Sequence, residues 1–287
     1  MLMFVYQHDM AAQGGCRTRK RNPGYVDGSA RLGGQGRNKR MKVNIIGGPA
    51  SPYVRKVLAA LTWKGIDYTI DPIVPFHGDD NFGKLSPLRR IPVYRDDQVT
   101  LCDSSVILQY LEDRWPQKSL YPADIAARAR ARWLEEYADT RVGDVFIWKL
   151  FYDAVIAPAI FGAERHPEQR AAVLAKDLPE VMDYLESQMP RDGFLCGAFS
   201  VADLALAPHF SNLAWARVEL DWTRWPKTGA WLTRVHEGSA LGELATQSGE
   251  MLRLPPQQHR DKLIELGFDV AAQSVGGHKP RRGVMLG

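Results

Sequence analysis

Residues 50–65, ASPYVRKVLAALTWKG, place a serine hydroxyl and a proline at the start of a predicted apolar helix. The preceding KVNII is β-branched and weakly alternating, which is typical of a buried strand, and Gly47-Gly48-Pro49 ends that strand. Pro52 suits the first helical position because the N–H that it lacks would be unpaired there. Ser51 therefore faces the N-terminal amides and the positive dipole end of the helix, where a thiolate or another anion would be stabilised.

A second role for Ser51 is equally compatible with this spacing. Serine before proline is common at helix starts, where its hydroxyl oxygen accepts a backbone N–H. Spacing alone leaves both roles open, a helix cap and a hydrogen-bond donor to an anion. Two later stretches have the same ambiguity: Arg90-Ile-Pro-Val93 enters a predicted strand, and Asp103-Ser104 begins a predicted helix.

The elements that position these residues form a β-α-β unit followed by a hairpin and a helix. After Gly65, residues 66–70 alternate as a second strand, which predicts parallel pairing with the first strand. A Pro- and Gly-containing loop follows, and residues 91–94 and 99–101 flank the polar turn of an antiparallel hairpin. A mixed sheet in residues 41–115 is a thioredoxin-like layout.

The rest of the chain has helical periodicity. Residues 118–123 are a predicted linker, and long helices are expected at about 124–162, 166–189, 201–217, 224–236 and 240–252. Ser200 and Asp203 have capping-box spacing, which is a structural device. The predicted fold class is α/β plus all-α: a thioredoxin-like domain over 41–117, an all-helical domain over 123–254, and a C-terminal helix with a frayed tail over 255–287.

Composition indicates a globular protein of one or two domains, since 45% of the 287 residues are hydrophobic and 24% are charged. We find no apolar run long enough to cross a bilayer and no signal-peptide core, so a cytoplasmic location and no membrane partner are expected. The three cysteines, Cys16, Cys102 and Cys196, are widely separated and lack metal-ligand spacing. Neither a disulfide framework nor a metal site is predicted.

Residues 1–40 carry most of the positive charge. Eight Lys/Arg against two Asp give this segment a net charge of +6, so the remainder carries −2 of the total +4. The segment is glycine-rich and has no periodic apolar face, and we expect it to be a disordered basic extension. Because it lacks aromatic interleaving or a helix for a groove, no nucleic-acid partner is predicted.

Together, four motifs resemble the cytosolic glutathione transferases over residues 41 to about 254. They are Ser51-Pro-Tyr-Val-Arg-Lys-Val57, Arg90-Ile-Pro-Val93, Asp103-Ser104, and Ser200-x-x-Asp203. Serine followed by proline and an aromatic residue is similar to the serine-type, bacterial-like classes. Cysteine in place of Ser51 would suggest the omega or other redox-active relatives, so thiol-disulfide chemistry is not expected.

The resemblance implies a role for each matching residue. Ser51 would be the catalytic residue, donating to the glutathione sulfur and favouring its thiolate. The Ile91–Pro92 bond would be cis, as is typical of this family, so that the backbone of Ile91 pairs with the cysteinyl segment of glutathione. Asp103 would hold the γ-glutamyl ammonium and Ser104 its carboxylate, with Arg90 a candidate for the glycine carboxylate. Tyr53 is the remaining binding residue, and it is the first alternative donor if Ser51 only caps the helix.

The predicted activity is conjugation of glutathione, as co-substrate, to a small hydrophobic electrophile. Alternatives are a glutathione-dependent isomerase, dehalogenase or ether-cleaving lyase, or a non-catalytic protein that binds glutathione or another ligand. The resemblance also implies a homodimer. Candidate residues of the second pocket are aromatic, although most aromatic residues at helical spacing belong to cores: Tyr53, Phe76, Phe146, Trp148, Tyr152, Phe210 and Trp215.

Overall fold

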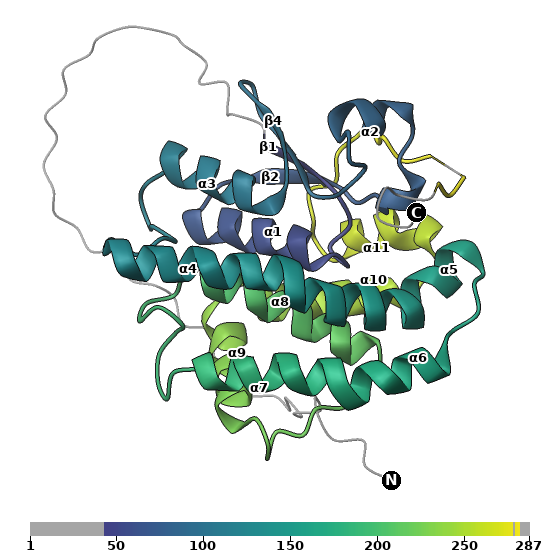
Figure 1. The fold of residues 1–287 in the computed structure, drawn as a ribbon. Coiled ribbons are helices and arrows are strands. Elements are labelled where there is room, and N and C mark those ends of the chain that lie inside the picture. Colours follow the sequence, from purple (N-terminus) through teal and green to yellow (C-terminus); the bar gives the residue numbers. More distant parts are fainter. Residues whose placement is uncertain (1–42, 278, 282–287) are drawn as a thin grey trace, which may run out of the picture. The chain divides into compact units, whose positions relative to one another are not determined.

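A computed structural model describes residues 43–277 and 279–281 (Figure 1). The predicted extension at 1–40 and the last six residues lie outside the described residues. Within the described part, none of the helices is both long and apolar enough to cross a membrane.

The first half of the described chain forms a mixed four-stranded sheet with strand order β2-β1-β3-β4. β1 pairs in parallel with β2 and antiparallel with β3, and β3 pairs antiparallel with β4. The predicted thioredoxin-like layout is therefore confirmed. Its elements are β1 (Val43–Ile46), α1 (Pro52–Lys64), β2 (Tyr68–Asp71), η1 (Pro75–His77), α2 (Asp80–Leu85), β3 (Val93–Arg95), β4 (Thr100–Cys102) and α3 (Ser104–Arg114).

The two faces of this sheet are covered by different helices, because successive strand residues point to opposite sides. Ile45 and Tyr94 belong to the large core that includes α1 and α3. Ile46 and Val93 belong to a smaller cluster with Phe82 of α2. The face that carries α1 and α3 is the one that meets the helical half (Figure 1).

The second half is all-helical, as predicted. α4, η2 and α5 run without interruption from residue 125 to 161, and α6, η3 and α7 do the same from 167 to 188; η2 and η3 have π-helical hydrogen bonding. The helices are α4 (Ile125–Tyr137), η2 (Ala138–Ile156), α5 (Ala157–Phe161), α6 (Pro167–Ala172), η3 (Val173–Asp177), α7 (Leu178–Gln188), α8 (Val201–Trp215), α9 (Pro226–Gly238) and α10 (Leu241–Leu252).

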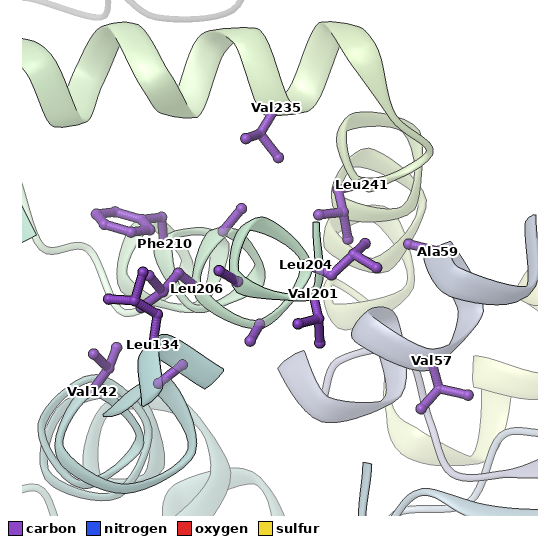
Figure 2. Packing of buried hydrophobic residues seen from close by; sticks show 14 of the residues in the cluster. Val57, Ala59, Leu134, Val142, Val201, Leu204, Leu206, Phe210, Val235 and Leu241 are labelled. Carbon is purple, nitrogen blue, oxygen red and sulfur yellow. The ribbon is translucent and has the colours of Figure 1, made fainter. Parts of the chain in front are cut away.

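Helix α8 is the centre of the core. Its residues 201–213 are all buried, and it packs against α1, α4, η2, α9 and α10. Figure 2 shows Val201, Leu204 and Phe210 of α8 among apolar side chains of these neighbours. The predicted capping box is present at its start: the Asp203 carboxylate accepts the N–H and hydroxyl of Ser200, both at 3.0 Å.

The C-terminal segment beyond α10 contacts the thioredoxin-like domain through its backbone. After η4 (Pro256–Gln258) and α11 (His259–Glu265), the chain returns to the thioredoxin-like domain and pairs with the free edge of β2. Ile70 N donates to Asp269 O at 2.8 Å, and Arg281 N donates to Phe76 O at 2.7 Å. These are backbone contacts, which a Gly-rich sequence makes as well as any other.

Candidate active site

The turn between β1 and α1 positions Ser51 as the N-cap of α1. Its hydroxyl oxygen accepts Val54 N at 3.4 Å, and Pro52 occupies the first helical position. A hydroxyl that accepts this bond still has its own hydrogen to donate. The helix-cap role is therefore present in the structure, and it leaves the hydroxyl able to act as a donor.

The loop before β3 lies directly beside this turn. The Ile91–Pro92 peptide bond is cis, as predicted. Gly47 has a φ of 141°, and a Cβ there would lie 2.8 Å from the Cβ of Ile91 and 2.8 Å from Val54 Cγ2. Only glycine fits at this point, where the two loops approach each other.

Asp103 and Ser104 form the start of α3. The Oδ1 atom of Asp103 accepts Ser105 N at 2.9 Å and Val106 N at 3.3 Å, so this carboxylate caps the helix. Asp103 itself is exposed, whereas Ser104 is buried. The Ser104 hydroxyl accepts a hydrogen bond from Lys56 Nζ at 3.1 Å.

Lys56 is a buried cation that sequence reasoning missed. Its ammonium lies 2.8 Å from Glu135 Oε1 and 3.0 Å from Asp139 Oδ2, and it also donates to the Ser105 hydroxyl at 3.0 Å. Burial lowers the pKa of Lys56, but Asp139 and Glu135 outweigh that effect and the pKa is raised. Lys56 thus links the start of α3 to α4 and η2, across the two halves of the chain.

Two adjacent arginines precede the cis bond. Arg89 donates to the carbonyls of Gly78 and Asp79 and lies over the ring of Phe82, so it anchors the loop before α2. The backbone N–H of Arg90 donates to the Ser86 hydroxyl at 2.9 Å. The positive charge of Arg90 lowers the pKa of Tyr53, but burial and the Asp139 carboxylate have larger effects in the opposite direction.

Tyr53 points from α1 toward η2. A Cβ on Gly143 would lie only 2.5 Å from the phenolic oxygen of Tyr53, so the ring packs tightly against the helix backbone there. Its ring also meets His209 edge-on at 5.5 Å between centroids. Burial, and then the nearby Asp139 carboxylate, raise the pKa of Tyr53, so its hydroxyl stays protonated at neutral pH.

A largely apolar cavity of about 190 Å³ adjoins these residues. Four of the seven predicted site residues line it, namely Ser51, Tyr53, Arg90 and Ile91; Pro92, Asp103 and Ser104 are not among its lining residues. Neighbours of these residues in the same two loops also line it, and three further segments complete its walls: the loop at 72–76, residues 147–160 of η2 and α5, and residues 251–259 at the end of α10 and beyond. The predicted aromatic residues among these walls are Phe76, Trp148 and Tyr152.

The other predicted aromatic residues have different surroundings. Phe146 and Phe210 are core residues that contact each other edge-on at 5.6 Å between centroids. Trp215 stacks against the guanidinium of Arg55 at 4.6 Å. Sequence reasoning did not predict that residues 251–259 line the cavity, because they lie at and beyond the end of the predicted helical domain and carry no motif. The sequence indicated an apolar surface here only through the apolar residues that continue from α10 to Leu252 and Leu254.

The comparisons with known proteins agree with this architecture. Residues 45–119 match the family profile "Glutathione S-transferase, N-terminal domain", and residues 151–234 match "Glutathione S-transferase, C-terminal domain". The chain is 31% identical over 170 residues to glutathione S-transferase theta-1 of Rattus norvegicus, covering 58% of this chain and 69% of that protein. It is 30% identical over 207 residues to theta-1 of Bos taurus, covering 69% and 82%.

A solved structure supports the same conclusion. The apo form of human glutathione S-transferase T1-1 superposes with a TM-score of 0.65 and 25% identity, covering 79% of this chain and 99% of that chain. The chain therefore belongs to the glutathione S-transferase family, a family of enzymes that use glutathione as co-substrate. The resemblance stated from the four motifs is confirmed.

Proposed function

We propose that this glutathione transferase conjugates the glutathione thiolate to a small hydrophobic electrophile, with Ser51 as the catalytic residue. The observation that carries this proposal is the position of Ser51: it lies at the N-terminus of α1 and on the wall of an apolar cavity. Helix amides and a hydroxyl donor stabilise an anion, while the apolar walls accept the group that the anion attacks.

The proposed step is nucleophilic attack by sulfur. The thiol proton leaves to water, and the Ser51 hydroxyl donates to the resulting thiolate, which lowers the thiol pKa. The sulfur lone pair forms a bond to the electrophilic carbon, and the leaving group departs with the electron pair of its own bond. Where the electrophile adds the thiolate across a double bond and has no leaving group, the π electron pair of that bond moves onto the product and is protonated by water.

The tripeptide would occupy the loops that surround Ser51. We assign the backbone of Ile91, beside the cis bond to Pro92, to the cysteinyl segment, and Arg90 to the glycine carboxylate. Asp103 Oδ1 is used in capping α3, so its Oδ2 is the oxygen assigned to the γ-glutamyl ammonium. Ser104, at the same helix start, is assigned to the γ-glutamyl carboxylate; its hydroxyl accepts from Lys56 and retains its hydrogen for that contact.

A panel of electrophiles, assayed with and without glutathione, tests the function. We expect glutathione-dependent turnover, falling roughly ten- to a thousandfold in Ser51→Ala, the scale for losing one preorganised donor. Ser51→Ala also removes a helix cap, so Asp124→Ala is the matched control: Asp124 caps α4 by accepting Ala127 N at 2.8 Å, and it is exposed. A control that loses as much activity as Ser51→Ala would refute the catalytic role of Ser51.

The products of the same panel separate the alternatives. A transferase accumulates the thioether and releases whatever leaving group the electrophile carries. An isomerase regenerates glutathione, a dehalogenase releases halide without accumulating a thioether, and an ether-cleaving lyase releases an alcohol or phenol from an ether substrate. A non-catalytic binding protein would bind glutathione and give no turnover. The apolar cavity favours an enzyme that takes a second, hydrophobic substrate.

We further propose a cytoplasmic homodimer, in which the thioredoxin-like domain of one subunit contacts the first long helices of the other. Exposed apolar side chains on the corresponding elements support it: Val106 on α3 is 46% exposed and Trp133 on α4 is 54% exposed. Sedimentation should give twice the mass of the chain, and a monomer mass that does not change with concentration would contradict the dimer.

A further inference from the structure

Arg55 is a fully buried cation placed directly behind the wall that carries Ser51. Its side chain is inside the protein, with no exposed surface, one helical turn after Ser51. Its guanidinium Nη1 donates to Pro49 O at 2.6 Å and Ala50 O at 3.1 Å. These are the two residues that precede Ser51, and Ala50 and Ser51 both line the cavity.

The other side of the guanidinium is held by α8. Nη2 donates to Pro208 O at 2.6 Å and to Asn212 Oδ1 at 2.5 Å, and the ring of Trp215 lies 4.6 Å from Arg55 Cζ. Asn212 Nδ2 in turn donates to Ala50 O at 3.0 Å. Arg55 and Asn212 therefore clamp the turn before Ser51 to the central helix of the other half.

The partners of this cation are neutral groups. Among the residues that the structure describes, no carboxylate lies within ion-pair distance of Arg55, and its Nε has no hydrogen-bond partner. The neighbouring titratable groups are His209 and His236, whose pKa values are lowered by burial, so both are uncharged at neutral pH. Lys56, the next residue, has Glu135 and Asp139 as its own partners.

A buried cation without a counter-charge costs free energy that a neutral residue would not. Burial lowers the pKa of Arg55 to about 9, which still leaves the group protonated at neutral pH. The clamp alone does not need that charge, because neutral donors can also bind carbonyl oxygens. A bound anion on the cavity side of the Ala50–Ser51 wall would receive its field with little screening.

We propose that Arg55 is a positioning residue with an electrostatic role: it holds the turn that carries Ser51, and its unpaired charge stabilises the glutathione thiolate bound on the other side of that turn. The inference rests on the proposed function, since it requires a thiolate at Ser51. Charges roughly 8–10 Å apart at an effective dielectric constant of about 20 change a pKa by about one unit.

Two substitutions of Asn212 separate the charge from the clamp. Asn212→Asp keeps an oxygen for Arg55 Nη2 but loses the donor to Ala50 O, and it places a carboxylate beside the guanidinium. Asn212→Ala loses the same donor and leaves the charge of Arg55 unmatched. The measurement is the pKa of the bound glutathione thiol, from thiolate absorbance against pH, with the pH profile of kcat/KM in parallel.

We expect Asn212→Asp to raise the bound-thiol pKa by about one unit relative to Asn212→Ala, which is about a tenfold smaller thiolate-to-thiol ratio below that pKa. Equal thiol pKa values in the two variants, with glutathione still bound, would show that Arg55 only clamps the turn, and the proposed function would stand. If the wild-type protein itself fails to bind glutathione or to lower its thiol pKa, the proposed function and this inference fall together.

Discussion

The contact between Tyr53 and Gly143 predicts how Gly143→Ala changes the free energy of unfolding. The sign of that change should depend on whether residue 53 is tyrosine or phenylalanine. Gly143 lies within η2, and a Cβ built there would be 2.5 Å from the phenolic oxygen of Tyr53. The next neighbours are Ala138 O at 3.4 Å and Tyr53 Cζ at 3.8 Å, which are ordinary contacts. The hydroxyl of Tyr53 is therefore the single obstacle to a methyl group at this position.

Two opposing effects set the magnitude. Overpacking a filled site costs about 1–3 kcal/mol, whereas replacing glycine by alanine inside a helix stabilises by about 0.8–1 kcal/mol. Gly143→Ala should therefore destabilise the wild-type protein by about 1 kcal/mol. In a Tyr53→Phe background the obstacle is gone, and the same substitution should stabilise by up to about 1 kcal/mol.

The assay is urea denaturation of the wild-type protein, both single variants and the double variant. The coupling free energy between the two positions should be about 2 kcal/mol, since it equals the overpacking that Tyr53→Phe relieves. In Gly143→Ala the displaced phenol should also enter the cavity and raise KM for the electrophile. If Gly143→Ala stabilises equally in both backgrounds, the phenol does not lie against Gly143 and the described wall of the cavity is wrong.

Three further predictions concern ionisable groups and the nucleophile. Lys56→Met should lower the free energy of unfolding by about 3–5 kcal/mol, because it leaves two carboxylates without their cation, whereas the surface control Lys262→Met should have a much smaller effect in the same urea titration. Burial lowers the pKa of His209 from 6.5 to about 4, so between these values the unfolded chain binds a proton that the folded protein does not. The free energy of unfolding should therefore decrease by up to about 3 kcal/mol as the pH is lowered from 6.5 to 4. His209→Gln should make the free energy of unfolding less dependent on pH over that range. In Ser51→Ala, raising the pH should recover part of the lost turnover, because bulk deprotonation supplies thiolate; a constant deficit at all pH values would contradict thiol activation.

Features written in local sequence were predictable. The Ser51 turn, the capping box at Ser200 and the hairpin each depend on residues within a few positions of one another, so spacing and turn chemistry were sufficient. The mixed sheet followed from the order of these elements. Four of the predicted site residues also line one cavity, which the four motifs implied only through the resemblance.

Features that depend on distant partners were missed. Arg55 and Lys56 were not among the predicted site residues, and the apolar spacing of Val54, Val57 and Leu58 does not say what covers the polar residues between them. Both cations are buried against partners that are distant in the sequence. Asn212 lies 157 residues after Arg55, and Asp139 lies 83 residues after Lys56. Helical periodicity cannot report a polar face that is covered by another domain.

Helix α1 is thus the element on which the two halves of the chain converge. Its first turn carries Ser51 toward the cavity, Arg55 fixes the preceding turn to α8, and Lys56 joins the start of α3 to α4 and η2. The residues assigned to glutathione all lie in the thioredoxin-like half, yet two of the segments that carry them are tied to the helical half: Asn212 donates to Ala50 O, and Asp139 accepts a hydrogen bond from the Ser105 hydroxyl. Because interior charges and hydrogen bonds tolerate little displacement, the geometry of the proposed thiolate site depends on the contact between the halves as much as on the residues that would touch glutathione.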